Sequence, residues 1–110
     1  MSDLAERSCV PCNADTPPLE GRELQEFRQQ VHDRWQVVDD HHLQAEVSFD
    51  DFRGALDFTD RVGEVAEEEG HHPEICLTWG EARLKLWTHA IDGLSENDFI
   101  LAAKIDEILG

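Results

Sequence analysis

Three histidines are the side chains of this chain best suited to proton-transfer chemistry. His71 and His72 are adjacent and lie between Gly70 and Pro73, and His89 follows further along the sequence. An imidazole exchanges a proton near neutral pH, so two of them can act as general acid and general base. Neighbouring side chains of an extended segment point in opposite directions. We therefore expect one of His71 and His72 to face a cleft and the other to support it.

The same histidines allow two other interpretations. Pairs of loop histidines are often only solvent-exposed, but Pro73 fixes the backbone here and favours a built site. His71, His72, His89 and Cys76 could also bind zinc. Adjacent residues seldom coordinate one ion, however, and none of the usual ligand spacings is present. The sequence therefore predicts acid-base chemistry without a metal or other cofactor.

The remaining histidines and cysteines are not expected to take part. Cys9 and Cys12 have the two-residue gap of a redox or zinc half-site, but no second pair follows. Free thiols in a flexible N-terminal tail are the favoured interpretation, and a zinc or disulfide staple is the alternative. The histidines expected on the surface, because they lack comparable neighbours, are His32, His41 and His42.

Hydrophobic periodicity predicts three helices that position these residues. The first covers residues 22–34 and has no Ser or Thr cap. The second is long, with a side-chain cap from Asp50 and an end at Gly70, where the chain must turn. Ser95 and Asp98 have the spacing of a capping box that starts the third. The apolar faces comprise Leu24, Phe27, Val31 and Trp35 in the first helix, and Phe52, Ala55, Leu56, Val62, Val65 and Ala66 in the second.

Alternating apolar and polar residues predict two β-hairpins. The first joins residues 35–38 to 43–49, and the second joins residues 75–79 to a strand that ends near His89. The fold class is therefore α+β, in the order α-β-β-α-β-β-α. It consists of a four-stranded antiparallel sheet with three helices packed on one face.

Composition limits the size and the partners of the protein. The chain has 110 residues, enough for one modest core, so we expect an N-terminal tail over residues 1–18 and a single domain over residues 19–110. Its formal net charge of -16 disfavours direct binding to nucleic acid. No apolar run is long enough to span a membrane and no secretion signal is evident, so we expect a soluble, cytoplasmic protein without membrane contact.

Together these residues resemble a known enzyme family. The segment 68–75, followed by Thr88-His89, Gly93-Leu94-Ser95 and Asp98, is similar to the pterin-4a-carbinolamine dehydratases. The family is also known as the dimerisation cofactor of a homeobox transcription factor. The similarity extends upstream through Trp35, Phe49, Phe52, Ala55, Leu56 and Val62 and covers roughly residues 19–109.

The resemblance implies a reaction and a set of site residues. The family removes water from 4a-hydroxytetrahydrobiopterin to give quinonoid dihydrobiopterin, with no cofactor, during tetrahydrobiopterin recycling. His71 and His89 would be the acid-base pair and His72 a third catalytic group that orients the substrate. Asp98 would orient His89 or cap its own helix, and Trp35 and Trp87 would wall the cleft or pack in the core. The implied substrate-binding residues are Gly70, His71, His72, Pro73, Trp87, Thr88, His89, Ala90 and Asp98.

The resemblance also implies partners and alternatives. Family members form homodimers and homotetramers, and an aromatic amino-acid hydroxylase would supply the pterin substrate. One alternative is a non-enzymatic role as dimerisation or interaction cofactor of a partner protein. The other is a molybdopterin-related pterin-binding role.

Overall fold

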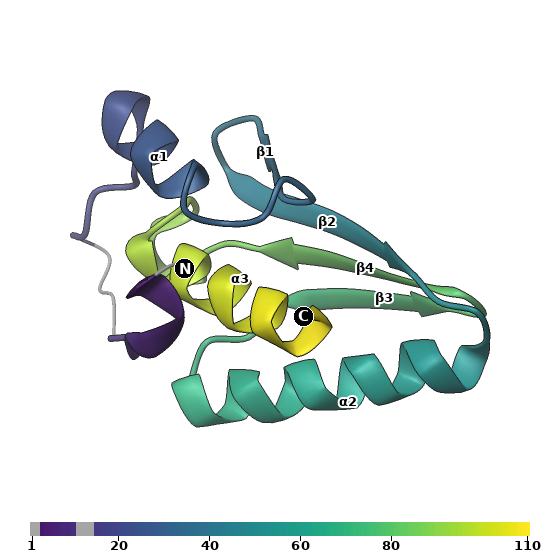
Figure 1. Cartoon of the computed structure of the whole chain (residues 1–110). Coiled ribbons are helices and arrows are strands. Elements are labelled where there is room, and N and C mark those ends of the chain that lie inside the picture. Colours follow the sequence, from purple (N-terminus) through teal and green to yellow (C-terminus); the bar gives the residue numbers. More distant parts are fainter. Residues whose placement is uncertain (1–2, 11–14) are drawn as a thin grey trace.

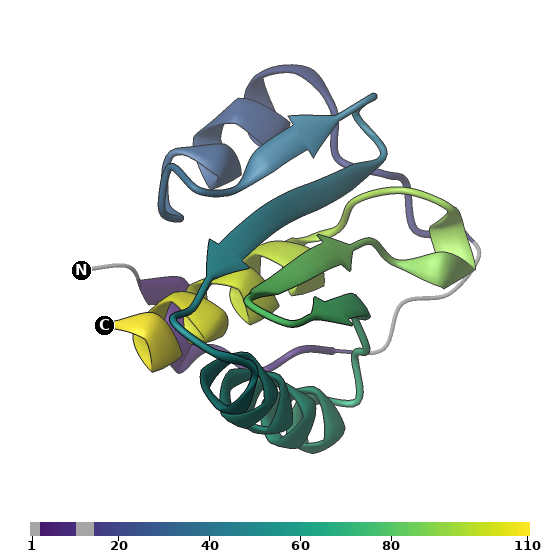
Figure 2. The same ribbon diagram turned by 90° about the vertical axis from the view of Figure 1, so that its right-hand side faces the viewer.

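Four antiparallel strands form one sheet in the order β1-β2-β4-β3 in a computed structural model that describes residues 3–10 and 15–110. The α+β class and the predicted order of elements are confirmed, and the helices cover one face of the sheet (Figures 1 and 2). The strands are β1 (Gln36–Val38), β2 (His42–Ser48), β3 (Glu74–Thr78) and β4 (Glu81–Leu86). The helices are η1 (Asp3–Glu6), α1 (Gly21–Arg28), α2 (Phe52–Glu69), η2 (His89–Ile91) and α3 (Glu96–Leu109).

The two central strands supply the sheet's contribution to the core. Leu43 of β2 lies opposite Leu86 of β4, and Ala45 lies opposite Leu84, all four being buried. Because side chains alternate across a strand, the residues between them face away from the helices. This period-two pattern is the one that predicted the hairpins, and it fixes the register that carries β4 toward the histidines.

The first helix is shorter than predicted. It ends at Arg28 rather than near residue 34, yet Val31 and Trp35 are still buried. The carboxylate of Asp106 on α3 accepts from the amide of His32 at 3.0 Å and from Nε1 of Trp35 at 2.9 Å. The first bond satisfies a backbone donor that a longer helix would have paired, and the second satisfies the buried indole N–H. Trp35 thereby lies in the core and does not wall a cleft.

The cap of the second helix lies one residue later than predicted. Asp51, and not Asp50, occupies the cap position, where its side chain accepts from the amide of Gly54 at 2.8 Å. Phe52 was predicted to face the core but is 44% exposed, because the helix begins there at the rim of the sheet. The predicted end is confirmed: Gly70 adopts a left-handed conformation with φ of 65°. Glycine takes this conformation without strain, and the chain turns directly into His71.

The N-terminal segment packs against the body of the protein. Leu4 in η1 is completely buried, and Figure 1 shows η1 lying beside α3. Cys12 lies outside the described residues, so the interpretation of the Cys9–Cys12 pair as free thiols, zinc ligands or a disulfide is untested. In the described part of the chain, no helix combines the length and apolar character needed to cross a bilayer.

Candidate active site

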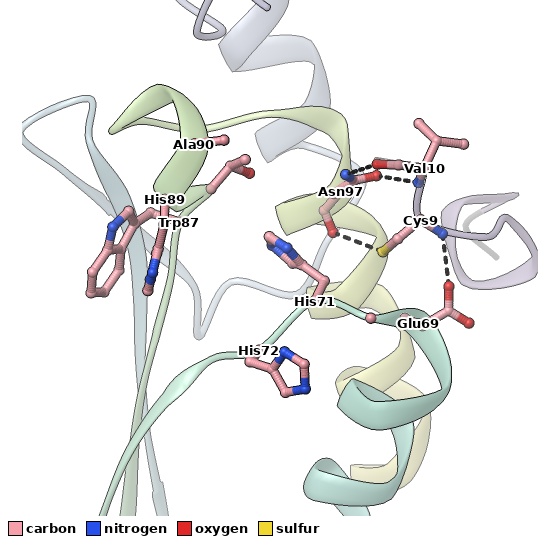
Figure 3. A pocket seen from close by; sticks show the side chains of 11 residues that line it. Cys9, Val10, Glu69, His71, His72, Trp87, His89, Ala90 and Asn97 are labelled. Carbon is pink, nitrogen blue, oxygen red and sulfur yellow. Dashed lines mark hydrogen bonds between the residues drawn. The ribbon is translucent and has the colours of Figure 1, made fainter. Parts of the chain in front are cut away.

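A cavity of about 490 Å³ opens where four segments of the chain meet (Figure 3). The end of α2, the segment after β4, the start of α3 and the N-terminal segment each contribute to it. Its lining includes most of the predicted site residues but neither Pro73 nor Asp98. The lining residues are Cys9, Val10, Glu69, Gly70, His71, His72, Trp87, Thr88, His89, Ala90 and Asn97.

His71 is held by a buried carboxylate. Its Nε2 lies 2.5 Å from Oδ1 of Asp98, whose side chain is 0% exposed. Oδ2 of the same carboxylate accepts from Oγ1 of Thr88 and from the amide of Ser95, each at 2.9 Å. The predicted capping role of Asp98 on α3 is confirmed. Its second partner is His71 and not His89, because the end of α2 brings His71 against the first turn of α3.

This pairing selects one tautomer of His71. An ionised carboxylate can only accept hydrogen bonds, so in this pair the Nε2–H of His71 donates to Oδ1 of Asp98. Nδ1 is then the nitrogen free to accept or release a proton. The side chain of His71 is only 13% exposed, so its ring is fixed while remaining accessible from the cavity. A buried carboxylate behind an imidazole is the arrangement that stabilises the imidazolium formed when the ring accepts a proton.

His72 points toward a different partner. Its Nε2 lies 2.6 Å from Oε2 of Glu67, and both side chains are largely exposed. The adjacent histidines therefore contact different carboxylates, as expected of neighbours in an extended segment. Both residues line the cavity, but the His71 side chain is mostly buried and the His72 ring is exposed and turned away from His89 (Figure 3).

His89 occupies the opposite wall. It begins η2, whereas the sequence placed it at the end of a strand, because β4 ends at Leu86 and Thr88 pairs with Gly93 to close a short loop. Its ring stacks on that of Trp87, with centroids 4.6 Å apart and planes 29° from parallel. Figure 3 shows His89 and His71 entering the cavity from opposite sides. A flat ligand between them would meet one imidazole on each side.

His41 and His42 are nearer the site than the sequence indicated. Both were predicted to be isolated surface residues, but their ring centroids lie 5.5 and 6.2 Å from that of Trp87. Nε2 of His41 also lies 2.8 Å from Oδ1 of Asp92, which follows η2. The β1–β2 turn thus contacts the loop that carries His89. No local pattern reveals this, because it depends on the pairing of β2 with β4.

The stability of the fold should depend on pH through His42. Burial, together with the positive charges of His41 and Lys85, lowers the pKa of His42 below its ordinary value of 6.5, and its Nε2 has no hydrogen-bond partner among the residues that the structure describes. Below about pH 6.5 the unfolded chain binds a proton at this position more readily than the folded one, so stability falls as pH falls. His42→Gln should remove this component. Urea unfolding between pH 7.5 and 5 should show the free energy of unfolding of the wild type falling more steeply than that of the variant.

His32→Gln is the matched control for this prediction, because His32 is exposed and far from the cavity in the fold. Its unfolding should follow the pH dependence of the wild type. Parallel pH curves for wild type and His42→Gln would contradict the prediction.

Sequence reasoning missed four lining residues: Cys9, Val10, Glu69 and Asn97. The two N-terminal residues were assigned to a tail, and the other two have no spacing that marks them. Within residues 3–10 and 15–110, no three His, Cys, Asp or Glu side chains are grouped so that they could hold a metal ion.

Comparison with solved structures first defines the class of the domain. A transcriptional coactivator/pterin dehydratase from Brucella melitensis superposes with a TM-score of 0.79 and 31% identity, covering 84% of this chain and 99% of that one. A pterin dehydratase-like protein described as a RuBisCO assembly factor in the alpha-carboxysome shares the fold. Its TM-score is 0.62 at 23% identity, over 72% of this chain and 93% of that one.

Sequence comparison then gives the family. The profile described as "Pterin 4 alpha carbinolamine dehydratase" matches residues 17–108, and the chain belongs to this family. A protein from Rubrobacter xylanophilus is 54% identical over 98% of this chain and all of its own length. One from Alkaliphilus metalliredigens is 49% identical over 97% of this chain and 96% of its own. Both carry the name "Putative pterin-4-alpha-carbinolamine dehydratase".

Proposed function

We propose that this protein dehydrates a 4a-hydroxytetrahydropterin, such as 4a-hydroxytetrahydrobiopterin, to the quinonoid dihydropterin, with histidines as acid and base. The observation that carries the proposal is the pairing of His71 with the buried Asp98 opposite the stacked His89 on one cavity. An aromatic amino-acid hydroxylase would supply the substrate in tetrahydrobiopterin recycling.

The reaction requires two proton transfers close together in space. The 4a-hydroxyl must receive a proton to leave as water, and N5 of the ring must lose one as the new double bond forms. His71, with Nε2–H fixed by Asp98, presents Nδ1 for one of these transfers. His89 supplies the second imidazole, and His72 orients the substrate. The pH-rate profiles of the His71 and His89 variants would assign the donor and the acceptor.

The flat ring of a pterin suits the wall formed by Trp87 and His89. A bicyclic ring can pack against this aromatic wall, as aromatic heterocycles do on indole. Gly70, Thr88 and Ala90 lie on the same cavity, and we assign them to substrate contact. Gly70 brings the backbone close to the ligand without a side chain.

Charge favours an uncharged pterin over a phosphorylated one. The described lining contains Glu69 but no lysine or arginine, and the nearby Lys104 is 3.7 Å from Glu69 and is neutralised by it. A phosphate would therefore find no free lysine or arginine among the described lining residues, and the net charge of -16 would oppose its approach. This argues against the molybdopterin-related role, whose ligand carries a phosphate.

A direct assay tests the proposal. The purified protein should accelerate conversion of chemically generated 4a-hydroxytetrahydropterin to quinonoid dihydropterin, followed by ultraviolet absorbance. His89→Ala should lower kcat/KM by roughly 10²-fold, the loss typical of one general acid or base, while His32→Ala should retain wild-type activity. A phosphorylated pterin should compete poorly for the site. An inactive wild type that still captures a partner protein would favour the interaction-cofactor role and overturn the proposal.

A further inference from the structure

The N-terminal segment is tied to α3 along its whole described length. Leu4 is completely buried, and Nζ of Lys104 donates to the carbonyl of Ala5 at 2.8 Å. Arg7 forms an ion pair with Glu96 near the start of the helix. Residues 3–10 therefore form a strap across α3, and we use this name for them below. The strap lies outside the region that the family profile matches, which begins at residue 17.

The far end of the strap is fixed at the cavity by three backbone hydrogen bonds. The amide of Cys9 donates to Oε1 of Glu69 at 2.7 Å. The amide of Val10 donates to Oδ1 of Asn97 at 3.0 Å, and Nδ2 of Asn97 donates back to the carbonyl of Val10 at 2.5 Å. Figure 3 shows Cys9, Val10 and Asn97 on the side of the cavity opposite Trp87 and His89. The strap is thus one wall of the cavity and is held in register with α2 and α3.

The chemistry of this wall is neutral and largely apolar. The backbone amides that reach it are already paired, so they offer little to a hydrogen-bonding ligand. Burial, helped by the negative charge of Glu69, raises the pKa of the Cys9 thiol to about 12, so the sulfur stays protonated and lies 3.6 Å from the carbonyl oxygen of Asn97. Val10 also lines the cavity and is 63% exposed. Such a surface fits a weakly polar substituent better than the amino-oxo edge of a pterin.

We propose that the strap selects the substrate: Cys9 and Val10 are specificity-determining residues that contact the substituent at C6 of the pterin. C6 is bonded to N5, one of the two reacting positions, so a ring held between His71 and His89 carries this substituent beside the catalytic groups. This inference rests on the proposed function, because it assumes that the cavity holds a pterin. It adds that a segment outside the family profile sets which pterin is preferred.

Two substrates and two variants test the strap. The ratio of kcat/KM for a 6-methyl and a 6-(dihydroxypropyl) 4a-hydroxytetrahydropterin should change in opposite directions in Val10→Ala, which enlarges the wall, and Val10→Trp, which fills it. We expect this kcat/KM ratio to change by roughly threefold to tenfold, a modest effect for a change of a few carbons in a pocket. Trp79→Ala removes an exposed aromatic residue of the β3–β4 turn and should leave the ratio within twofold.

Hydrogen exchange provides a second measurement that does not depend on turnover. A stable 7,8-dihydropterin at saturation should slow exchange of the amides of Cys9 and Val10, measured by mass spectrometry of the N-terminal peptide. If the wild type is active and both Val10 variants keep its kcat/KM ratio, the strap assignment alone is overturned. The same follows if the amides of Cys9 and Val10 exchange at an unchanged rate when binding measurements show that the site is saturated. A wild type that neither binds nor dehydrates either pterin would overturn the proposed function and the strap assignment with it.

Discussion

Replacing His71 with alanine should lower kcat/KM for pterin dehydration by roughly 10³-fold, the middle of the range for loss of a positioned general acid or base. The loss should be larger than for His89→Ala, because His71 is the imidazole whose tautomer is fixed by a buried carboxylate. His89 is exposed, and its ring stacks on that of Trp87. Steady-state kinetics with chemically generated substrate would measure both losses.

The pH-rate profile separates a chemical role for His71 from a structural one. A limb of the wild-type kcat/KM profile should disappear in His71→Ala, while the variant still binds a dihydropterin with an affinity near that of the wild type. His32→Ala should retain both the activity and the profile of the wild type. A His71→Ala protein that is folded and within threefold of wild-type kcat/KM would exclude His71 from catalysis.

Replacing Asp98 with alanine should cost about 3–5 kcal/mol of folding stability, as expected when one partner of a buried ionic network is removed. The carboxylate is completely buried and joins three segments: the end of α2 through His71, the segment after β4 through Thr88, and the start of α3 through Ser95. Alanine would remove the buried acceptor that these three donors share. Urea unfolding at neutral pH would measure the loss.

Asp98→Asn distinguishes positioning from folding. The amide has nearly the same shape but no negative charge, so it should be less destabilising than alanine while still lowering kcat by roughly 10²-fold or more, because the imidazolium of His71 loses its counter-charge. KM should change little, since Asp98 does not line the cavity. Asp106→Asn is the matched control: this carboxylate on the same helix also accepts from several donors, but it lies at Trp35 and away from the cavity. The Asp106→Asn variant should be less stable than the wild type but should have the same kcat. Equal reductions of kcat in Asp98→Asn and Asp106→Asn would contradict a positioning role for Asp98.

The sequence by itself determined the order of helices and strands. It also determined the end of α2 and the start of α3, which are the helix ends that form the site. Alternation in β2 and β4 and the glycine at position 70 are local signals, because pleating and backbone handedness act on neighbouring residues. The Ser95–Asp98 capping pattern is local for the same reason. These signals predicted the turn that delivers His71 and the helix start that lies beside it.

Only the tertiary structure decided which groups meet. Asp98 contacts His71 rather than His89, and His41 and His42 approach Trp87. Cys9 and Val10 bind Glu69 and Asn97 at the cavity, and in every case the groups that meet come from distant parts of the sequence. The first helix ends early because Asp106, more than seventy residues away, satisfies the donors beyond it. Such contacts depend on strand register and helix packing, which bring distant donors and acceptors together, and no pattern within a short window encodes them.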